Sequence, residues 1–377
     1  MLFGLQFLLI FISILIVLEN INFIHAPFIR YSISVIFIYM LLFLLKKQFK
    51  RNVNFLILVY PIIFLSILTF FRGFESDDLS IKKYLSSAFS FYFFPLLLLI
   101  RVDSFVILKF LKSITFLIFL VNLFVLFTLS LWLESAFFTD QISRTLMSIS
   151  GIIFFFLLPF NPKFKSVITA SFIFSVVLNI FMARRAESFF FSGMFIYTLI
   201  EGFKFNPLKN SLYIIITISV LAFLVSNSDF GLTLLNRYNE GYENREFFIE
   251  EVLLSLSQNN SFVFGEGAQA KYYSYSQKSD RLIVEHGFYD MLLRSGLVSV
   301  ILFSLLSIMA IYRGFFKSNN TFVRRLAVYI LLYLALMFGH GVFEFSYRLF
   351  FLWVAISICL SNDFLNIRDS DISKSLS

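Results

Sequence analysis

The chain has 377 residues, of which 59% are hydrophobic and only 14% charged, with a mean hydropathy of +0.86 and a net charge of +8. An ordinary soluble domain is about half apolar and about a quarter charged, so this composition excludes that class. Apolar runs recur along the whole sequence and lack the short alternation of a β-barrel. The composition therefore predicts an all-α polytopic membrane protein.

We expect about twelve transmembrane helices, since each needs roughly 17–25 apolar residues. The first run, Leu2 to Leu18, lacks a basic start and a small-residue cleavage site, so we interpret it as a retained helix and not as a signal peptide. The spans are predicted near residues 2–18, 31–45, 53–71, 86–100, 113–133, 147–160, 164–182, 188–201, 210–226, 287–312, 322–339 and 347–361. Nine helices thus occupy residues 1–225, a long loop residues 226–286, three helices residues 287–361, and a tail residues 362–377.

Basic residues set the orientation, because cytoplasmic loops carry an excess of Lys and Arg. With both termini in the cytoplasm, 17 of the 31 basic residues fall on the inner side and eight in short outer loops. The long loop and all three histidines then lie at the outer face. In a membrane protein this rule also accounts for the net charge of +8, which would otherwise suggest a nucleic-acid partner.

The long outer loop contains the segment "NREFFIEEVLLSLS", residues 244–257. Asn244 is a plausible N-cap, and Glu246, Glu250 and Glu251 lie opposite an apolar face, so we expect a helix on the membrane surface or against the bundle. It is followed by "FGEGAQAKYYSYSQ", in which Tyr273 and its neighbouring tyrosines are candidates to stack on sugar rings, although loop tyrosines often only pack.

Several arginines are candidates for an anion site, because the guanidinium fork matches phosphate oxygens. Arg184 and Arg185 are adjacent in the outer turn "ARRAES", where they could also be plain interfacial anchors. Arg237, Arg245 and Arg281 belong to the long loop. Arg245 lies in the first turn of the expected helix, where a cation opposes the helix dipole unless an anion binds it.

The segment "VEHGFYDMLLRSGL", residues 284–297, places ionisable groups at the start of an apolar run. His286, Asp290 and Arg294 are four residues apart, so on a helix they form one stripe. Asp290 and Arg294 could simply neutralise each other, and His286 could be a capping residue. An arginine one to two turns inside a span costs on the order of 2.5–3.5 kcal/mol, however, so we expect this stripe to face a cavity.

The segment "GHGVFEFSYR", residues 339–348, repeats this spacing at the outer end of the last two helices. His340, Glu344 and Arg348 would form a second stripe, and the two stripes predict one polar cavity open to the outside. The only cysteine, Cys359, excludes a disulfide within the chain, and the sequence has no Walker, Gly-x-Ser-x-Gly or HExxH motif. We therefore expect neither a cofactor nor a metal.

The order of these features resembles the bacterial O-antigen ligase/polymerase superfamily. An arginine-bearing turn is followed by a long outer loop with an Arg-led helix and a "GEG" turn, and then by "EHGFYDMLLRSGLVSVILFSLL" with its Gly296-Leu297 step. The resemblance covers residues 183–306. Gly287, Tyr289 and Ser299 depart from the residues common in that family, where Asn, Leu and Gly are frequent.

The resemblance implies a metal-independent, GT-C-like glycosyltransferase in the cytoplasmic (inner) membrane, with its active site at the outer face. The donor would be an oligosaccharide on undecaprenyl pyrophosphate, and the partners would be membrane lipid and a chain-length regulator and flippase of the same pathway. In the metal-free mechanism we assign Arg185 to stabilising the pyrophosphate and His286 to the acceptor hydroxyl, either as base or only as a hydrogen-bonding group. Arg184, Arg245, Arg237, Arg281, Asp290, Arg294, His340, Glu344, Arg348 and Tyr273 are the expected substrate-binding residues.

The expected function is polymerisation of a surface polysaccharide such as an O-antigen or a capsule. Two alternatives remain open. A ligase of the same superfamily would move the finished chain to lipid A-core of lipopolysaccharide. A flippase or other transporter of lipid-linked oligosaccharide would need charges along a central path, whereas the charges here collect at the outer end.

Overall fold

The computed structural model describes residues 56–72, 92–100, 148–160, 169, 172–173, 185–203, 245–275, 278–281, 284, 286–338 and 347–376. Most of these residues are helical, as the sequence predicts. The predicted spans 2–18, 31–45, 113–133 and 210–226 lie outside the described residues, as does most of 164–182. The chain forms two compact units, one from Met1–Ser113 with Glu250–Ser377 and the other from Ile114–Ile249.

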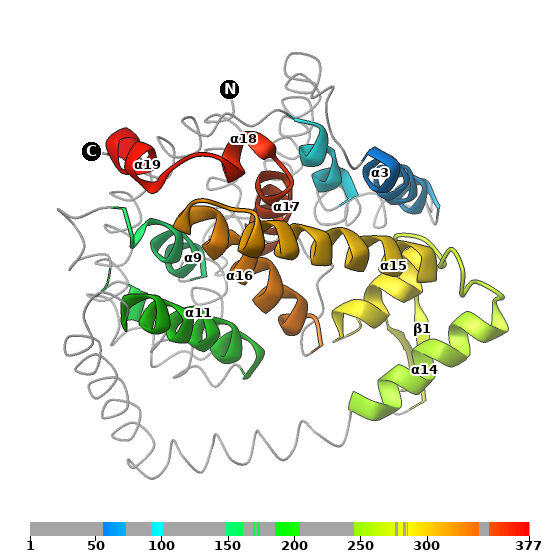
Figure 1. Ribbon diagram of the computed structural model, residues 1–377. Helices are drawn as coiled ribbons and strands as arrows, with labels where there is room; N and C mark the ends of the chain where they lie inside the picture. The colour runs from blue at the N-terminus through cyan, green and yellow to red at the C-terminus, as the bar shows by residue number, and fades with distance from the viewer. Residues whose placement is uncertain are drawn as a thin grey trace, which may run out of the picture. The chain divides into compact units, whose positions relative to one another are not determined.

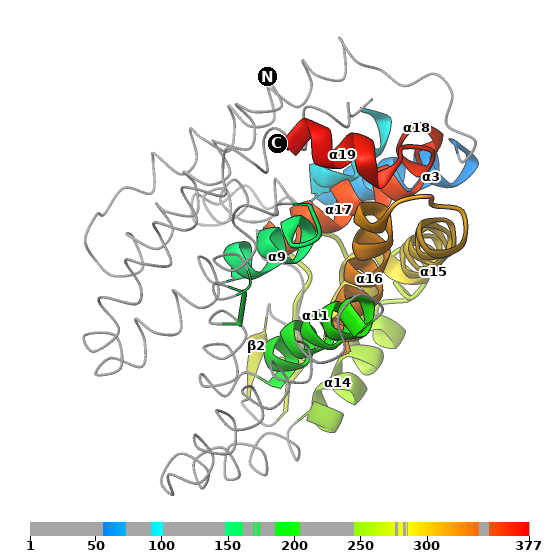
Figure 2. The same cartoon turned by 60° about the vertical axis from the view of Figure 1, so that its left-hand side comes forward.

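The first unit contains most of the described elements. Its helices and strands are α3 (Leu56–Phe71), the 3-10 helix η2 (Phe94–Leu99), most of α14 (Arg245–Gln258), β1 (Tyr272–Ser274), β2 (Ser279–Arg281), α15 (Gly287–Phe316), α16 (Thr321–Leu336), α17 (Tyr347–Cys359), α18 (Asn362–Leu365) and α19 (Asp369–Leu376). Helix α15 packs against α3, α16 and α17, and in both views α16 lies beside it (Figures 1 and 2).

Helices α15, α16 and α17 approach closely at a small-residue crossing. A Cβ atom on Gly314 would lie 2.6 Å from Cβ of Ala327 and 3.1 Å from Sγ of Cys359. Glycine therefore lets the helices meet where any side chain would push them apart. Around the crossing, Val323, Leu326 and Ile330 are fully or almost fully buried, and they form an apolar core with residues of α17.

The segment after α17 is folded, although the sequence suggested only a tail. Asn320 is the N-cap of α16 and accepts a 2.8 Å hydrogen bond from the Val323 N–H. Its Nδ2 also donates to the carbonyls of Phe364 and Ile367, at 2.8 and 3.0 Å. One buried amide thus holds the start of α16 against α18 and the residues that follow it.

The second half of the predicted fourth span, residues 92–100, is not the α-helix that the sequence predicted. Its described residues contain the 3-10 helix η2 instead of an α-helix, with Pro95 in the first turn. Proline fits the start of a helix because its missing N–H would have no partner there. Residues Phe94 to Leu99 are all buried, and η2 packs against α17 and α3.

The long loop holds the predicted helix and a β-hairpin that the sequence did not predict. Helix α14 begins at Arg245, as the N-cap assignment of Asn244 requires. The assignment of Glu251 to its polar face is wrong, because Glu251 is buried and accepts a 2.8 Å hydrogen bond from the Tyr275 N–H. Strands β1 and β2 pair antiparallel, with Tyr273 opposite Asp280.

The second unit contains α9 (Ser148–Leu157) and α11 (Arg185–Phe203), which pack against each other. They match the predicted spans 147–160 and 188–201. Gly151 of α9 faces the ring of Phe191 from α11, so the helices meet at a position without a side chain. Phe155 also contacts Tyr197 edge to face, with ring centroids 6.1 Å apart.

Within the described residues, α15 is the one helix that is both long and apolar enough to cross a membrane. It is not continuous. Gly296 has φ +77° and ψ 174°, outside the helical region, and this residue separates a first part, Gly287 to Ser295, from a second part that begins at Leu297. In Figure 1 the yellow first part turns away from the gold second part.

Candidate functional site

The break in α15 is occupied by residues 261–270 of the long loop, which we call the GEG loop. The amides of Glu266 and Gly267 donate to the carbonyls of Leu293 and Arg294, at 2.8 and 2.9 Å. Beyond the break, the amide of Leu297 donates to the carbonyl of Phe262 at 3.0 Å. The loop therefore supplies hydrogen-bond partners for main-chain groups that the interrupted helix cannot satisfy internally.

Glycines make this contact possible on both sides. Gly265 and Gly296 have φ values of +69° and +77°, which residues with a side chain rarely adopt. A Cβ atom on Gly265 would lie 2.6 Å from the Gly296 nitrogen, and one on Gly296 would lie 2.5 Å from the Gly265 nitrogen. The sequence shows both the "GEG" turn and the Gly296-Leu297 step, but not that the two meet.

The same loop also closes the end of α3. The amide of Ala268 donates to the carbonyls of Thr69 and Arg72, at 3.0 and 3.1 Å. Nη1 of Arg72 donates in return to the carbonyl of Phe264 at 3.0 Å. The GEG loop thus joins the last turn of α3 to the break in α15.

Glu266, which the sequence analysis did not single out, holds the loop to the end of α14. Its Oε1 accepts hydrogen bonds from Ser255 Oγ at 3.3 Å, from Asn259 Nδ2 at 3.0 Å and from Ser261 Oγ at 3.0 Å. A carboxylate accepts several such bonds well, because each is strengthened by its charge. The signal in the sequence is an acidic residue between two glycines after a Ser/Asn-rich helix end.

Asp290 and Arg294 form an ion pair one turn before the break. Arg294 Nε donates to Asp290 Oδ1 at 2.9 Å, and both residues are buried. Arg294 Nη1 also donates to the carbonyl of Ala268, and Tyr92 interacts with the same guanidinium. The alternative in which the two charges neutralise each other is therefore the one that the structure shows, and the arginine also binds the GEG loop.

His286 lies at the N-cap position of α15 and has an extended backbone, so it precedes the helix. Of the predicted stripe, only Asp290 and Arg294 therefore lie on the helix. Its ring contacts Tyr289 and Phe338 edge to face, with centroids 4.7 and 5.7 Å apart. The neighbouring Gly287 amide donates to the Met337 carbonyl at 2.7 Å, which joins this end of α15 to the end of α16. His286 is thus a half-buried imidazole in an aromatic setting.

The other predicted site residues are dispersed. Arg348 is buried in α17, and its carbonyl accepts a 2.7 Å hydrogen bond from Tyr329 Oη. Tyr273 is exposed beside Tyr275, and Arg281 ends β2. Arg185 and Arg245 are the first residues of α11 and α14, and their side chains lie outside the described part. Four further predicted site residues lie wholly outside the described residues: Arg184, Arg237, His340 and Glu344.

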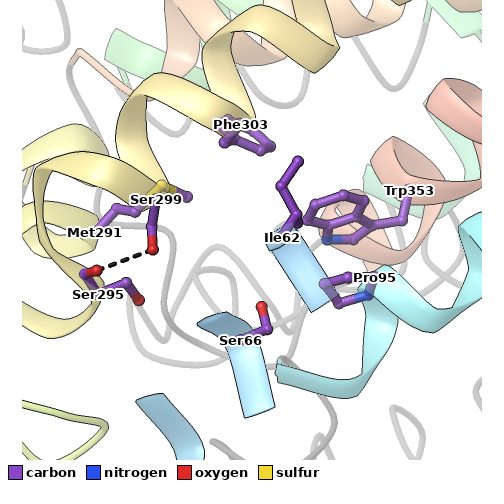
Figure 3. A pocket seen from close by; sticks show the side chains of 8 residues that line it. All are labelled: Ile62, Ser66, Pro95, Met291, Ser295, Ser299, Phe303 and Trp353. Atoms are coloured by element: carbon purple, nitrogen blue, oxygen red, sulfur yellow. Dashed lines mark hydrogen bonds between the residues drawn. The ribbon is translucent and has the colours of Figure 1, made fainter. Parts of the chain in front are cut away.

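A pocket lies where α15 meets α3, η2 and α17 (Figure 3). Met291 and Ser295 line it from before the break, and Ser299 and Phe303 from after it. Ser299 Oγ donates to the Ser295 carbonyl at 2.9 Å, across Gly296. Trp353 contacts Phe303 there, and its Nε1 has no hydrogen-bond partner among the described residues. Ile62, Ser66 and Pro95 complete the lining.

The described residues contain no group of three or more His, Cys, Asp or Glu side chains that could hold a metal ion. No family model, curated protein or solved structure matches the chain.

Proposed function

We propose that the chain is a membrane glycosyltransferase that polymerises a bacterial surface polysaccharide. In this proposal it has about twelve transmembrane helices in a GT-C-like arrangement and lies in the cytoplasmic membrane. It transfers a growing glycan from undecaprenyl pyrophosphate to another lipid-linked repeat unit at the outer face. The proposal starts from the order of motifs in residues 183–306, which resembles the O-antigen ligase/polymerase superfamily.

The observation that carries most weight is the buried Asp290–Arg294 pair beside the GEG loop. Burying an unpaired charge in a protein is costly, and here each buried charge is paired with the other beside the loop. Here the arginine connects the helix that follows His286 to the long loop. This supports a site built from the loop and the start of α15, where a lipid-linked substrate could reach it from the membrane.

The proposed reaction needs two kinds of side chain. The acceptor hydroxyl oxygen attacks the anomeric carbon of the donor glycan, and the bond from that carbon to the pyrophosphate oxygen breaks. The pyrophosphate leaves with the bonding electrons, and arginines, with Arg185 and Arg184 first and Arg245 next, stabilise its charge. His286 takes the hydroxyl proton, because the unperturbed pKa of an imidazole, roughly 6.5, suits proton transfer near neutral pH.

The contacts of Arg294 refine its role within this proposal. Its guanidinium donates to Asp290 and to the Ala268 carbonyl, so we assign the Asp290–Arg294 pair to positioning the loop and not to contact with the donor. Tyr273 and its neighbour Tyr275 are exposed and fit a sugar-stacking role, whereas Tyr272 is buried and does not.

The experiment is to measure the glycan that remains on undecaprenyl pyrophosphate in a strain lacking this protein. A polymerase predicts single repeat units stranded at the outer face of the membrane. Long finished chains on the carrier would instead indicate the ligase that transfers to lipid A-core. Single units confined to the inner leaflet would indicate a flippase.

A further inference from the structure

The exposed face of α15 after the break is a continuous apolar stripe. Its members follow the helical spacing of three and four residues: Leu297, Ile301, Leu305, Ile308, Tyr312 and Phe316. No residue from 295 to 312 is charged, while Arg294 precedes this stretch and Arg313 and Lys317 follow it. At 1.5 Å per residue, the uncharged residues 297–312 rise about 24 Å. The stripe as far as Phe316, which passes Arg313 near its end, rises about 30 Å, the thickness of a bilayer hydrocarbon core.

A second apolar surface continues this stripe at the break. Phe262, Val263 and Phe264 are consecutive residues of the GEG loop, and they are 40%, 49% and 52% exposed. The loop is bonded to the first turn after the break, because the amides of Leu297 and Val298 donate to the carbonyls of Phe262 and Val263. We call these three loop residues the apolar tip.

The main-chain carbonyls of the apolar tip all have hydrogen-bond partners. The carbonyl of Phe262 accepts from the Leu297 amide at 3.0 Å, that of Val263 from the Val298 amide at 3.3 Å, and that of Phe264 from Arg72 Nη1 at 3.0 Å. An exposed loop in water does not need internal partners for its carbonyls, whereas an unpaired carbonyl in hydrocarbon costs several kcal/mol. All three carbonyls are paired although the side chains are exposed.

We propose that the apolar tip, Phe262 to Phe264, inserts into the outer boundary of the lipid bilayer, and that Gly296 marks the depth at which α15 enters the hydrocarbon. The membrane-spanning helix then begins at Leu297, and Asp290 and Arg294 lie above the hydrocarbon. The occupant of this surface is lipid. This inference requires a membrane location but is independent of glycosyl transfer.

The test is a depth measurement on the full chain reconstituted in phosphatidylcholine vesicles. Cys359 is the only cysteine, so Cys359→Ser gives a background for single cysteines carrying an environment-sensitive fluorophore. Val263→Cys reports the apolar tip, and Phe262→Cys is a second reporter at the same surface. Ile308→Cys is the reference within the stripe, and Tyr273→Cys, on the exposed hairpin, is the reference for water.

The expected result is a loss of fluorescence at residue 263 with a nitroxide placed shallow on the lipid chain, and little loss with aqueous iodide. The label at 308 should respond most to a deep nitroxide, and the label at 273 only to iodide. Quenching of both 263 and 262 by iodide alone would overturn the inference. So would protection of these labels from both quenchers, which would indicate that a second copy of the chain covers the tip. Iodide quenching at 308 would instead overturn the membrane span itself.

Discussion

Gly265 and Gly296 face each other across the contact between the GEG loop and the break in α15. A Cβ atom on either glycine would lie within 2.6 Å of the main-chain nitrogen of the other. They are 31 residues apart in the sequence, and both have a positive φ. This pair fixes the geometry on which the candidate site depends, because it sets where the long loop joins the helix after His286.

Replacing Gly296 by alanine should therefore destabilise the protein. The new Cβ meets the main chain of Val263 and Phe264, which cannot move aside like a flexible side chain, and the φ of +77° is strained for alanine. We expect a loss of about 1–3 kcal/mol from backbone strain alone, and more from the clash. Thermal unfolding in detergent measures it. Ser304→Ala, at a half-buried position of the same helix, is the matched control and should unfold near the wild-type temperature.

Asp290 and Arg294 should be strongly coupled. Removing one partner leaves a buried charge unpaired, at a cost of about 3–5 kcal/mol, whereas removing both leaves none. The losses of unfolding free energy caused by Asp290→Asn and by Arg294→Met should therefore add up to more than the loss caused by the double substitution. A double-mutant cycle by denaturant unfolding measures the coupling, which we expect at about 1–3 kcal/mol. Strictly additive effects would contradict the pairing.

Glu266→Ala should loosen the GEG loop without unfolding the chain. The substitution removes the acceptor shared by Ser255, in the last turn of α14, and by Asn259 and Ser261, which follow the helix. Hydrogen bonds to a charged group contribute about 1.5–3 kcal/mol each. Hydrogen exchange at the amides of Glu266 to Ala268 should accelerate by tenfold or more, since about 1.4 kcal/mol corresponds to a factor of ten. Glu250→Ala, on the exposed face of α14, is the control and should leave this exchange unchanged.

Asn320→Ala should release the segment of α18 and α19 from the start of α16. The buried amide caps the helix and donates to two carbonyls, so its loss should cost about 2–4 kcal/mol. Limited proteolysis after residue 360 measures the release. The neighbouring Asn319→Ala is the matched control, because Asn319 is exposed and uses its main-chain amide to bond Leu365.

His286→Ala should reduce polymer formation on the order of 10²–10⁴-fold if the imidazole acts as base. The reduction should appear in the length of the surface polysaccharide, with single repeat units accumulating on the carrier and the protein present at its normal level. Lys278→Ala, on the exposed turn of the hairpin, is the control and should support full-length polymer. Full-length polymer from the His286→Ala protein would remove His286 from the site.

The sequence by itself determined the helical segments and much of their extent. The apolar runs predicted α3, α9, α11, α15, α16 and α17 within a few residues at most ends. A long run of apolar residues at helical spacing can bury its side chains and pair its main-chain groups in few forms other than a helix. Taking Asn244 as an N-cap predicted a helix that starts at the next residue, and α14 begins at Arg245. Four-residue spacing was enough to predict the Asp290–Arg294 pair, since such residues are neighbours on any helix.

Only the tertiary structure decided what lies between those segments. The contact of Gly265 with Gly296, the three donors to Glu266 and the bond from Arg294 to Ala268 all join residues whose sequence neighbours give no hint of the partner. Glu251 shows the same limit, because helical periodicity assigned it to the polar face and a main-chain donor from the hairpin draws it inside. Local spacing determines which residues share a face of one helix, whereas the loop that fills a break in a helix is chosen by long-range packing and main-chain hydrogen bonding.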